Sequence, residues 1–166
     1  MQFSTQGQER MPTRILIADD NPRMLRVLSL TLNERPDWVI CGAASNGLEA
    51  VSKAAELVPD VVILDLTMPD LNGIQAGSTI HTAAPKIRLL LFTQHNVDGA
   101  LESEARKAGF SGAVTKGMRS SLIDAIEALL RGESFFLKSS PITPISDSEQ
   151  NQTVPMITID ETAEKA

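Results

Sequence analysis

Short runs of consecutive apolar residues alternate along this chain with longer segments in which apolar residues recur every three or four positions. The clearest run, Val61 to Leu64, has no polar residue in alternation, so it predicts a strand buried on both faces. Such strands are typical of a parallel sheet that is covered by helices on both sides. The remaining runs predict four more strands, over residues 13–18, 37–44, 86–92 and 110–115.

A segment with helical periodicity follows each predicted strand. Asn21 is the expected N-cap of the first helix, with Pro22 at the first helical position, where its missing N–H costs nothing. Either Ser120 or Ser121 is expected to cap the last helix. The three helices between them are expected over residues 47–58, 73–82 and 97–107. The buried stripe of the second helix is expected to consist of Leu48, Val51, Ala55 and Val58.

Five strand–helix units in succession predict an α/β fold, because the crossover between parallel strands is right-handed. We expect a doubly wound, flavodoxin-like sheet of five parallel strands in the order 2-1-3-4-5, with helices on both faces. This domain is expected to span residues 13–132. Residues 1–12 are interpreted as a flexible N-terminal extension. Residues 133–166 are interpreted as a linker remnant and a mostly disordered acidic tail, rich in Ser, Thr and Pro.

Charge and cysteine content exclude several classes of protein. The formal net charge of −6 argues against a general nucleic-acid binder, which would normally carry a basic stripe. Cys41 is the only cysteine, so neither an intrachain disulfide nor a thiolate metal cluster can form. No apolar run approaches the roughly 20 residues of a spanning helix, and the N-terminus lacks a signal-peptide pattern. We therefore expect a cytoplasmic protein that does not bind membranes.

Carboxylates follow two of the predicted strands directly. Asp65 ends the run from Val61, and Asp19 and Asp20 end the first strand. Strands 1 and 3 are neighbours in the expected order, and their carboxyl ends form the crevice in which such sheets bind ligands. Three carboxylates held together repel one another unless a cation joins them. Because the ligands are all oxygen atoms, the sequence predicts a Mg²⁺ site.

Two other strand ends carry a hydroxyl and an ammonium group. Thr93 ends the fourth strand and Lys116 follows the fifth. A carboxylate, a Mg²⁺ site, a hydroxyl and a lysine around one crevice can receive and hold a phosphoryl group. Asp65 would attack as a nucleophile while the metal and Lys116 neutralise charge on the transferring oxygens.

Four groups of residues therefore occur together: the acids within Ile17 to Asn21, the segment Leu64 to Gly73, the hydroxyl of Thr93, and Ala108-Gly109 followed by Lys116. This combination resembles the receiver domains of two-component response regulators over roughly residues 13–132. It is most like the receivers that precede a helix-turn-helix DNA-binding domain. No such domain follows within this sequence, so we expect either a stand-alone receiver or the product of a truncation, and no direct binding to DNA.

The resemblance implies a role for each acid of the crevice. Asp65 would accept a phosphoryl group from a histidine of a sensor histidine kinase or phosphotransfer protein. Asp20 and Asp65 would bind Mg²⁺ directly together with the backbone carbonyl of Thr67, and Asp19 would act mainly through a metal-bound water. The chain would phosphorylate and dephosphorylate itself in a Mg²⁺-dependent manner, without being an enzyme for a separate substrate.

The resemblance also implies how the signal leaves the crevice. Lys116 would pair with the acyl phosphate, and Thr93 would move to hydrogen-bond a phosphate oxygen. The face formed by the fourth helix, fifth strand and fifth helix would then change and bind a partner or form a homodimer. Receivers usually place a tyrosine or phenylalanine three residues before the lysine, and this chain has Ala113 there. The usual coupled movement of hydroxyl and ring therefore cannot occur in its familiar form.

Two other functions remain open from the sequence. Ala113 favours a phosphorylation-independent interaction module that keeps the receiver fold. A Mg²⁺-dependent phosphohydrolase shares the aspartate-plus-metal logic, but Thr67 stands where such enzymes usually carry a second acid. His81 and His95 are expected to be solvent-exposed helix residues, and Phe110 a core residue at a strand end.

Overall fold

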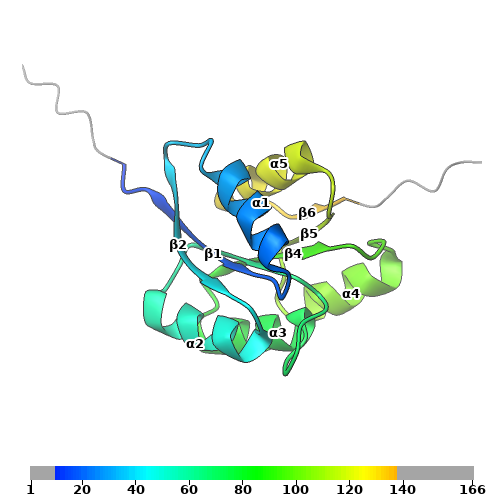
Figure 1. Ribbon diagram of the computed structural model, residues 1–166. Helices are drawn as coiled ribbons and strands as arrows, with labels where there is room; N and C mark the ends of the chain where they lie inside the picture. Colours follow the sequence, from blue (N-terminus) through cyan, green and yellow to red (C-terminus); the bar gives the residue numbers. More distant parts are fainter. Residues whose placement is uncertain (1–9, 138–166) are drawn as a thin grey trace, which may run out of the picture.

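In the described part of the chain, six parallel strands form one sheet through the middle of the molecule (Figure 1). The computed structural model describes residues 10–137, and within them the strand order is β2-β1-β3-β4-β5-β6. The expected order of the first five strands is thereby confirmed. The strands are β1 (Thr13–Ala18), β2 (Trp38–Ala44), β3 (Val61–Leu64), β4 (Arg88–Thr93), β5 (Gly112–Thr115) and β6 (Phe135–Phe136).

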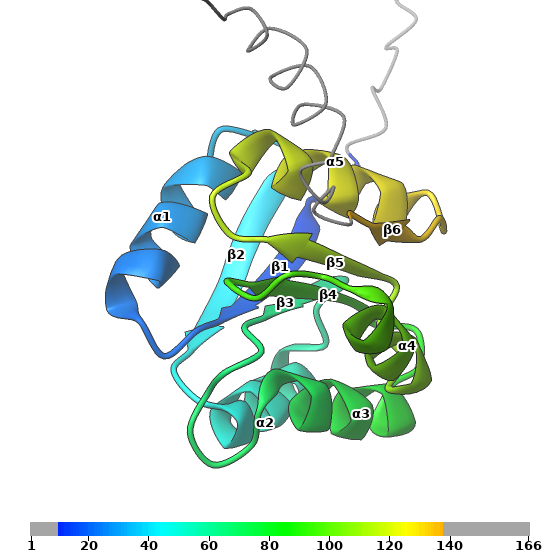
Figure 2. The ribbon, with the colours of Figure 1, turned by 90° about the vertical axis from the view of Figure 1, so that its right-hand side faces the viewer.

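Within residues 10–137, five helices cover the two faces of this sheet (Figure 2). They are α1 (Pro22–Leu32), α2 (Gly47–Leu57), α3 (Gly73–Ala83), α4 (Gly99–Lys107) and α5 (Arg119–Leu130). Helices α1 and α5 lie on one face, and α2, α3 and α4 lie on the other. The doubly wound, flavodoxin-like architecture is therefore as predicted.

Alternate side chains of each central strand enter different cores. In β1, Ile15 and Ile17 pack with the helices α1 and α5, whereas Leu16 packs with α2, α3 and α4. In β3, Ile63 packs with α1 and α5, and Val62 packs with α2, α3 and α4. All four residues of this strand are buried. A strand with two buried faces must be apolar throughout, so the run in the sequence follows from its central position.

The helix ends agree with the sequence in one case and differ in another. The side chain of Asn21 accepts a hydrogen bond from the backbone N–H of Arg23, and Pro22 opens α1 as expected. The expected serine cap of α5 is wrong, because this helix already begins at Arg119 and its N-cap, Met118, makes no side-chain hydrogen bond. Ser120 and Ser121 lie inside the first turn.

The expected buried stripe of α2 is wrong at Leu48, Ala55 and Val58, whereas Val51 is partly buried and packs against the core. Leu48 is 55% exposed and Val58 62% exposed, whereas the small residues Ala50 and Ala54 are buried. The helix lies close to the β3–α3 loop at its start, since a Cβ atom on Gly47 would lie 2.1 Å from the carbonyl oxygen of Leu71. Small side chains permit this close packing, and Leu48 and Val58 lie at the surface, while Leu57 still packs against the core.

Strand β6 comes from a segment that the sequence analysis placed in a linker. Phe135 pairs with Gly112 and Phe136 with Ala113, so the sheet extends one strand beyond the five expected. Residues 1–9 of the expected N-terminal extension and residues 138–166 of the expected acidic tail lie outside the described part of the chain.

Candidate functional site

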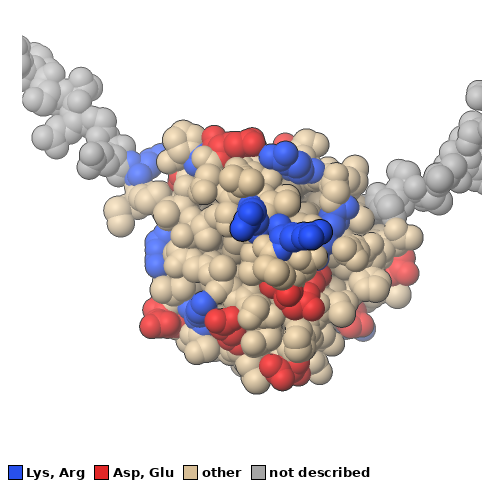
Figure 3. Space-filling view, viewed as in Figure 1, with Lys and Arg blue, Asp and Glu red and all other residues tan. Residues whose placement is uncertain are grey.

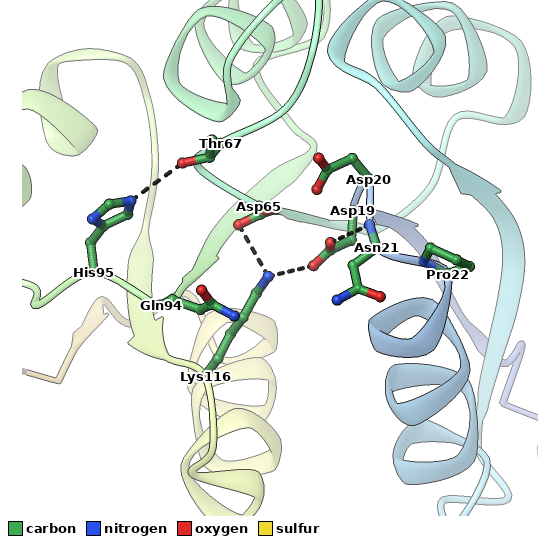
Figure 4. A pocket seen from close by; sticks show the side chains of 9 residues that line it. All are labelled: Asp19, Asp20, Asn21, Pro22, Asp65, Thr67, Gln94, His95 and Lys116. Carbon is green, nitrogen blue, oxygen red and sulfur yellow. Dashed lines mark hydrogen bonds and ion pairs between the residues drawn. The ribbon is translucent and has the colours of Figure 1, made fainter.

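A crevice of about 480 Å³ opens at the carboxyl ends of β1, β3 and β4 and just after β5 (Figure 4). It is the switch point expected from the strand order, because the chain leaves β1 and β3 towards opposite faces of the sheet. The crevice is lined by Asp19, Asp20, Asn21, Pro22, Asp65, Thr67, Gln94, His95 and Lys116.

Backbone hydrogen bonds extend the sheet as far as the two buried acids. The N–H of Asp65 donates to the carbonyl oxygen of Ala18 at 3.0 Å, and the N–H of Asp19 donates to that of Ala44 at 3.0 Å. Asp19 is 1% exposed and Asp65 is 6% exposed. Both carboxylates are thus held by the rigid ends of strands, not by free loop backbone.

Lys116 joins the two buried acids. Its Nζ lies 2.6 Å from Oδ2 of Asp19 and 3.2 Å from Oδ1 of Asp65 (Figure 4). The backbone N–H of Lys116 donates to the carbonyl oxygen of Thr93 at 2.7 Å, which fixes the lysine against the end of β4. The side chain is 7% exposed, so its interaction with the carboxylates is weakly screened by solvent.

The surroundings of Asp65 favour the protonated form of its carboxyl group. Burial raises the pKa of this carboxyl above the ordinary 3.8, and the negative charge of Asp19 raises it further. The ammonium group of Lys116 acts in the opposite sense and limits the rise. A group so placed gains from any additional positive charge beside it.

The acids form a cluster with the donor set of a hard cation. Asp19, Asp20 and Asp65 each offer one carboxylate oxygen, and these oxygens lie within 4.8 Å of one another. Asp20 is exposed, so it faces the open side of the crevice. Oδ1 of Asp19 already accepts the N–H of Asn21 at 2.9 Å. Clustered oxygen ligands of like charge fit Mg²⁺, the cation predicted from the sequence.

Thr93 lies behind the crevice and does not line it. Its side chain is fully buried, and its hydroxyl accepts the backbone N–H of His95 at 3.0 Å. Thr67 does line the crevice, and its exposed hydroxyl lies 3.3 Å from Nε2 of His95. The structure therefore brings together all the predicted residues, with Thr93 one layer deeper than the others.

Sequence reasoning missed His95 as a residue of the site. It was expected on a solvent-exposed helix, but α4 begins only at Gly99, with Asp98 as its N-cap. His95 lies in the loop between β4 and α4, at the mouth of the crevice (Figure 4). Its position two residues after the strand-end Thr93 was the available signal. His81 is in α3 as expected, but half-buried.

Comparison with known proteins agrees with this geometry. The family model described as response regulator receiver domain matches residues 15–127, which is more than half of the chain. The chain belongs to this family. Receiver domains act in two-component systems, generally accept phosphoryl groups and are not enzymes, and generally bind Mg²⁺ at an acidic pocket.

Curated relatives include both a response regulator and an enzyme. The response regulator protein VraR of Staphylococcus aureus is 32% identical over 127 residues, which are 76% of this chain and 60% of the relative. The protein-glutamate methylesterase/protein-glutamine glutaminase of Thermotoga maritima is 39% identical over 103 residues, which are 62% of this chain and 30% of that protein. The match thus spans less than two thirds of each relative's length.

Solved receiver structures have the same fold. The response regulator domain of Thermotoga maritima CheB is 33% identical and has a TM-score of 0.66, with 70% of this chain and 94% of that chain covered. A two-component response regulator of the LuxR family from Aurantimonas sp. is 31% identical and has a TM-score of 0.73, with 84% of this chain and 99% of that chain covered.

Within residues 10–137, no helix combines the length and apolar character needed to cross a membrane.

Proposed function

We propose that Asp65 accepts a phosphoryl group from a phosphohistidine of a sensor histidine kinase or phosphotransfer protein, and that the chain works as a response regulator receiver. The observation that carries the proposal is the position of Lys116, whose ammonium lies between the carboxylates of Asp19 and Asp65. A crevice with one buried lysine and three acids is suited to hold the oxygens of a phosphoryl group beside a carboxylate nucleophile.

The reaction transfers one phosphoryl group from nitrogen to oxygen. A carboxylate oxygen of Asp65 forms a bond to phosphorus while the bond between phosphorus and the donor's imidazole nitrogen breaks. The bonding electron pair stays on that nitrogen, and the donor leaves as a neutral imidazole when its other ring nitrogen already carries a proton. Asp65 reacts as the carboxylate and supplies no proton. Lys116 lies where it can shift from Asp65 to a phosphoryl oxygen and so stabilise the added charge.

Asp19, Asp20 and Asp65, with the backbone carbonyl of Thr67, would hold Mg²⁺ in this crevice. The ion would supply positive charge to the phosphoryl oxygens. The raised pKa of Asp65 supports this assignment, because a carboxyl that is desolvated by burial and stands beside the charge of Asp19 gains from a cation. The exposed position of Asp20 leaves its oxygens accessible from the open side.

Thr93 would report the arrival of the phosphoryl group. Its hydroxyl accepts a hydrogen bond from His95, which leaves its own proton free to be donated. Rotation of this side chain towards Asp65 would change the β4–α4 loop that His95 belongs to. A partner protein, or a second copy of the chain, would bind the surface of α4, β5 and α5 differently after that change.

The face shown in Figure 3 carries lysine, arginine and acidic side chains in small separate groups, without a continuous basic stripe.

The experiment is intact-mass measurement after incubation with Mg²⁺ and a small phosphodonor such as phosphoramidate. The wild-type chain is expected to gain the mass of one phosphoryl group, and Asp65→Asn none. Asp124→Asn, which removes an exposed acid of α5, is the matched control and is expected to behave like wild type. Equal labelling of Asp65→Asn and wild type would refute Asp65 as the acceptor, and no labelling of wild type would refute the proposed function.

The complete crevice favours a phosphoacceptor over the phosphorylation-independent module. The three acids and Lys116 are held together by the fold, although such a module would not need them. The phosphohydrolase is not favoured either. Thr67 offers a hydroxyl that lies near His95, where that chemistry would need an acid.

A further inference from the structure

Ala113, where receivers usually carry an aromatic side chain, has a phenylalanine beside it in space. Ala113 is in β5 and is fully buried, and its partner in the parallel register is Phe136 of β6. Both residues belong to the core on the α2, α3 and α4 side of the sheet, so their side chains point to the same face. A ring therefore lies next to Ala113 although the residue itself has none.

Strand β6 has two residues and pairs with β5 at the edge of the sheet. The N–H of Phe135 donates to the carbonyl oxygen of Ser111 at 2.9 Å, and the N–H of Leu137 donates to that of Ala113 at 3.0 Å. The approach requires a glycine, since a Cβ atom on Gly112 would lie 2.6 Å from the carbonyl oxygen of Phe135. An edge strand of two residues is the part of a sheet that opens most readily.

The ring of Phe136 also contacts α4. The guanidinium carbon of Arg106 lies 4.0 Å from the centre of this ring, within the range of a cation–π interaction. Arg106 is itself fixed on the helix, because its guanidinium pairs with the carboxylate of Glu102 at 3.0 Å. Phe136 thus connects the edge of the sheet with the last turn of α4.

The other end of α4 is connected to the crevice. The helix is capped by Asp98, whose side chain accepts the N–H of Leu101 at 2.8 Å. The loop before it contains His95, which contacts Thr93 through its backbone N–H and Thr67 through its ring. A change in the position of α4 would therefore alter the contacts at the mouth of the crevice and those of Phe136.

We propose that Phe136 is the positioning residue that couples α4 to β5 in this chain, in place of a side chain at Ala113, and that β6 is a strap released when α4 moves. The strap occupies the edge of β5, so a partner of the surface formed by α4 and β5 has access to this edge only after β6 leaves. This inference deepens the proposed function by naming how the crevice controls its output surface.

Histidine-selective NMR of the full chain tests the coupling without phosphorylation. The chain has two histidines, and they lie near opposite ends of α4. His95 lies at the crevice, and the ring of His81 packs against Gly109, just after the helix, where an added Cβ atom would lie 2.2 Å from its Cγ. Phe136→Ala is expected to move the ring signals of both histidines. If the ring of Phe136 acts only locally, the substitution is expected to shift the His81 signal at most and to leave the His95 signal unchanged.

Phe135→Ala is the matched control, because Phe135 lies on the same strand but packs into the core on the other face of the sheet. It is expected to leave the His95 signal in place. Phe136→Leu retains apolar volume, removes the ring from Arg106, and serves if the alanine variant does not fold. Phe136→Leu is also expected to shift the ring signal of His95. An unchanged His95 signal in a folded Phe136 variant overturns the coupling.

Hydrogen exchange with a phosphate mimic tests the release of the strap. Beryllofluoride and Mg²⁺ are added to wild type and to Asp65→Asn, and adduct formation is followed separately by fluorine NMR. Faster exchange of the Phe135 and Leu137 amides in the wild-type adduct alone supports release. An adduct with unchanged exchange at these amides overturns it and leaves the proposed function standing. No adduct would count against the proposed function, while the histidine signals still decide the coupling.

Discussion

The N–H of Asp65 donates to the carbonyl oxygen of Ala18 at 3.0 Å, and this bond places the carboxylate of Asp65 beside that of Asp19. Two acids held together by strand ends cannot move apart to relieve their repulsion. Their negative charge must therefore be balanced by positive groups beside them. Lys116 supplies part of this balance, and a bound cation would supply the rest.

Loss of the lysine should therefore affect both stability and chemistry. Lys116→Ala leaves two buried carboxylates without their partner, and we expect the free energy of unfolding at neutral pH to fall by about 1–3 kcal/mol. Labelling of Asp65 by the phosphodonor should slow by about a hundredfold, the usual effect of removing one preorganised donor. Urea unfolding and the time course of the intact mass measure the two effects.

Lys86→Ala is the control for this change, because Lys86 is exposed and lies in the turn before β4. It should leave both quantities close to wild type. Labelling of Lys116→Ala at the wild-type rate would contradict the role given to the lysine.

Asp65 should make the fold less stable at neutral pH than at acid pH. Its pKa in the folded protein lies above the ordinary 3.8, so the unfolded chain releases this proton first as the pH rises. Stability is lost between these two pKa values, and the whole loss is present above the folded one. We expect Asp65→Asn to be more stable than wild type at neutral pH, with a difference that disappears below pH 3.8.

Urea unfolding of both proteins across this pH range measures the difference. A neutral-pH stability of Asp65→Asn equal to or below that of wild type would be inconsistent with the raised pKa. Asp124→Asn, which removes an exposed acid outside the crevice, is measured alongside as the control variant.

Magnesium should stabilise the folded chain through the acid cluster. Binding to the folded state alone contributes about 2.7 kcal/mol at a free concentration roughly a hundred times the dissociation constant. Asp20→Asn removes the exposed member of the cluster and should lose most of this effect. Thermal unfolding in MgCl₂ and in NaCl of equal ionic strength separates binding from general screening. Equal stabilisation of wild type and Asp20→Asn would remove Asp20 from the site.

A glycine inside α3 should resist substitution. A Cβ atom on Gly77 would lie 2.3 Å from Cε2 of Phe110, a buried ring. We expect Gly77→Ala to lower the free energy of unfolding by about 1–3 kcal/mol, because the core is overpacked. Gly99, the first residue of α4, has no atom within 4 Å of its added Cβ. Gly99→Ala should be neutral or stabilise by about 0.5 kcal/mol, and urea unfolding of both variants gives the comparison.

The fold could be predicted from the sequence because its central strands are apolar on both faces. The run Val61 to Leu64 predicts a strand covered on both faces, and the position of β3 in the interior of the sheet confirms this. The two-residue strand β6 could not be predicted, because a pair of phenylalanines has no periodicity. Its pairing depends on Gly112, which is far away in the sequence.

The buried face of α2 shows a second limit. Hydrophobicity assigns Leu48 and Val58 to the core, but close packing at Gly47 favours the small side chains of Ala50 and Ala54. Leu48 and Val58 are then exposed, while Val51 and Leu57 pack against the core. Only the distance between neighbouring backbones decides this, and a sequence pattern does not contain that distance.

The site was predictable where chemistry and strand ends coincide. Asp19, Asp65 and Lys116 converge because parallel strands end at one edge of the sheet. The role of His95 was not predictable, since loop conformation places it. The depth of Thr93 was not predictable either, because the hydroxyl is turned towards its own loop.

The ion pair between Lys116 and Asp19 joins residues 97 positions apart, and this has a consequence for synthesis of the chain. A nascent chain presents its acids first and its lysine last. Until β5 leaves the ribosome, β1 and β3 can pair only at the cost of bringing uncompensated carboxylates together. The crevice therefore favours late closure of the sheet, and any fragment that ends before Lys116 should be hindered from forming a native β1–β3 edge.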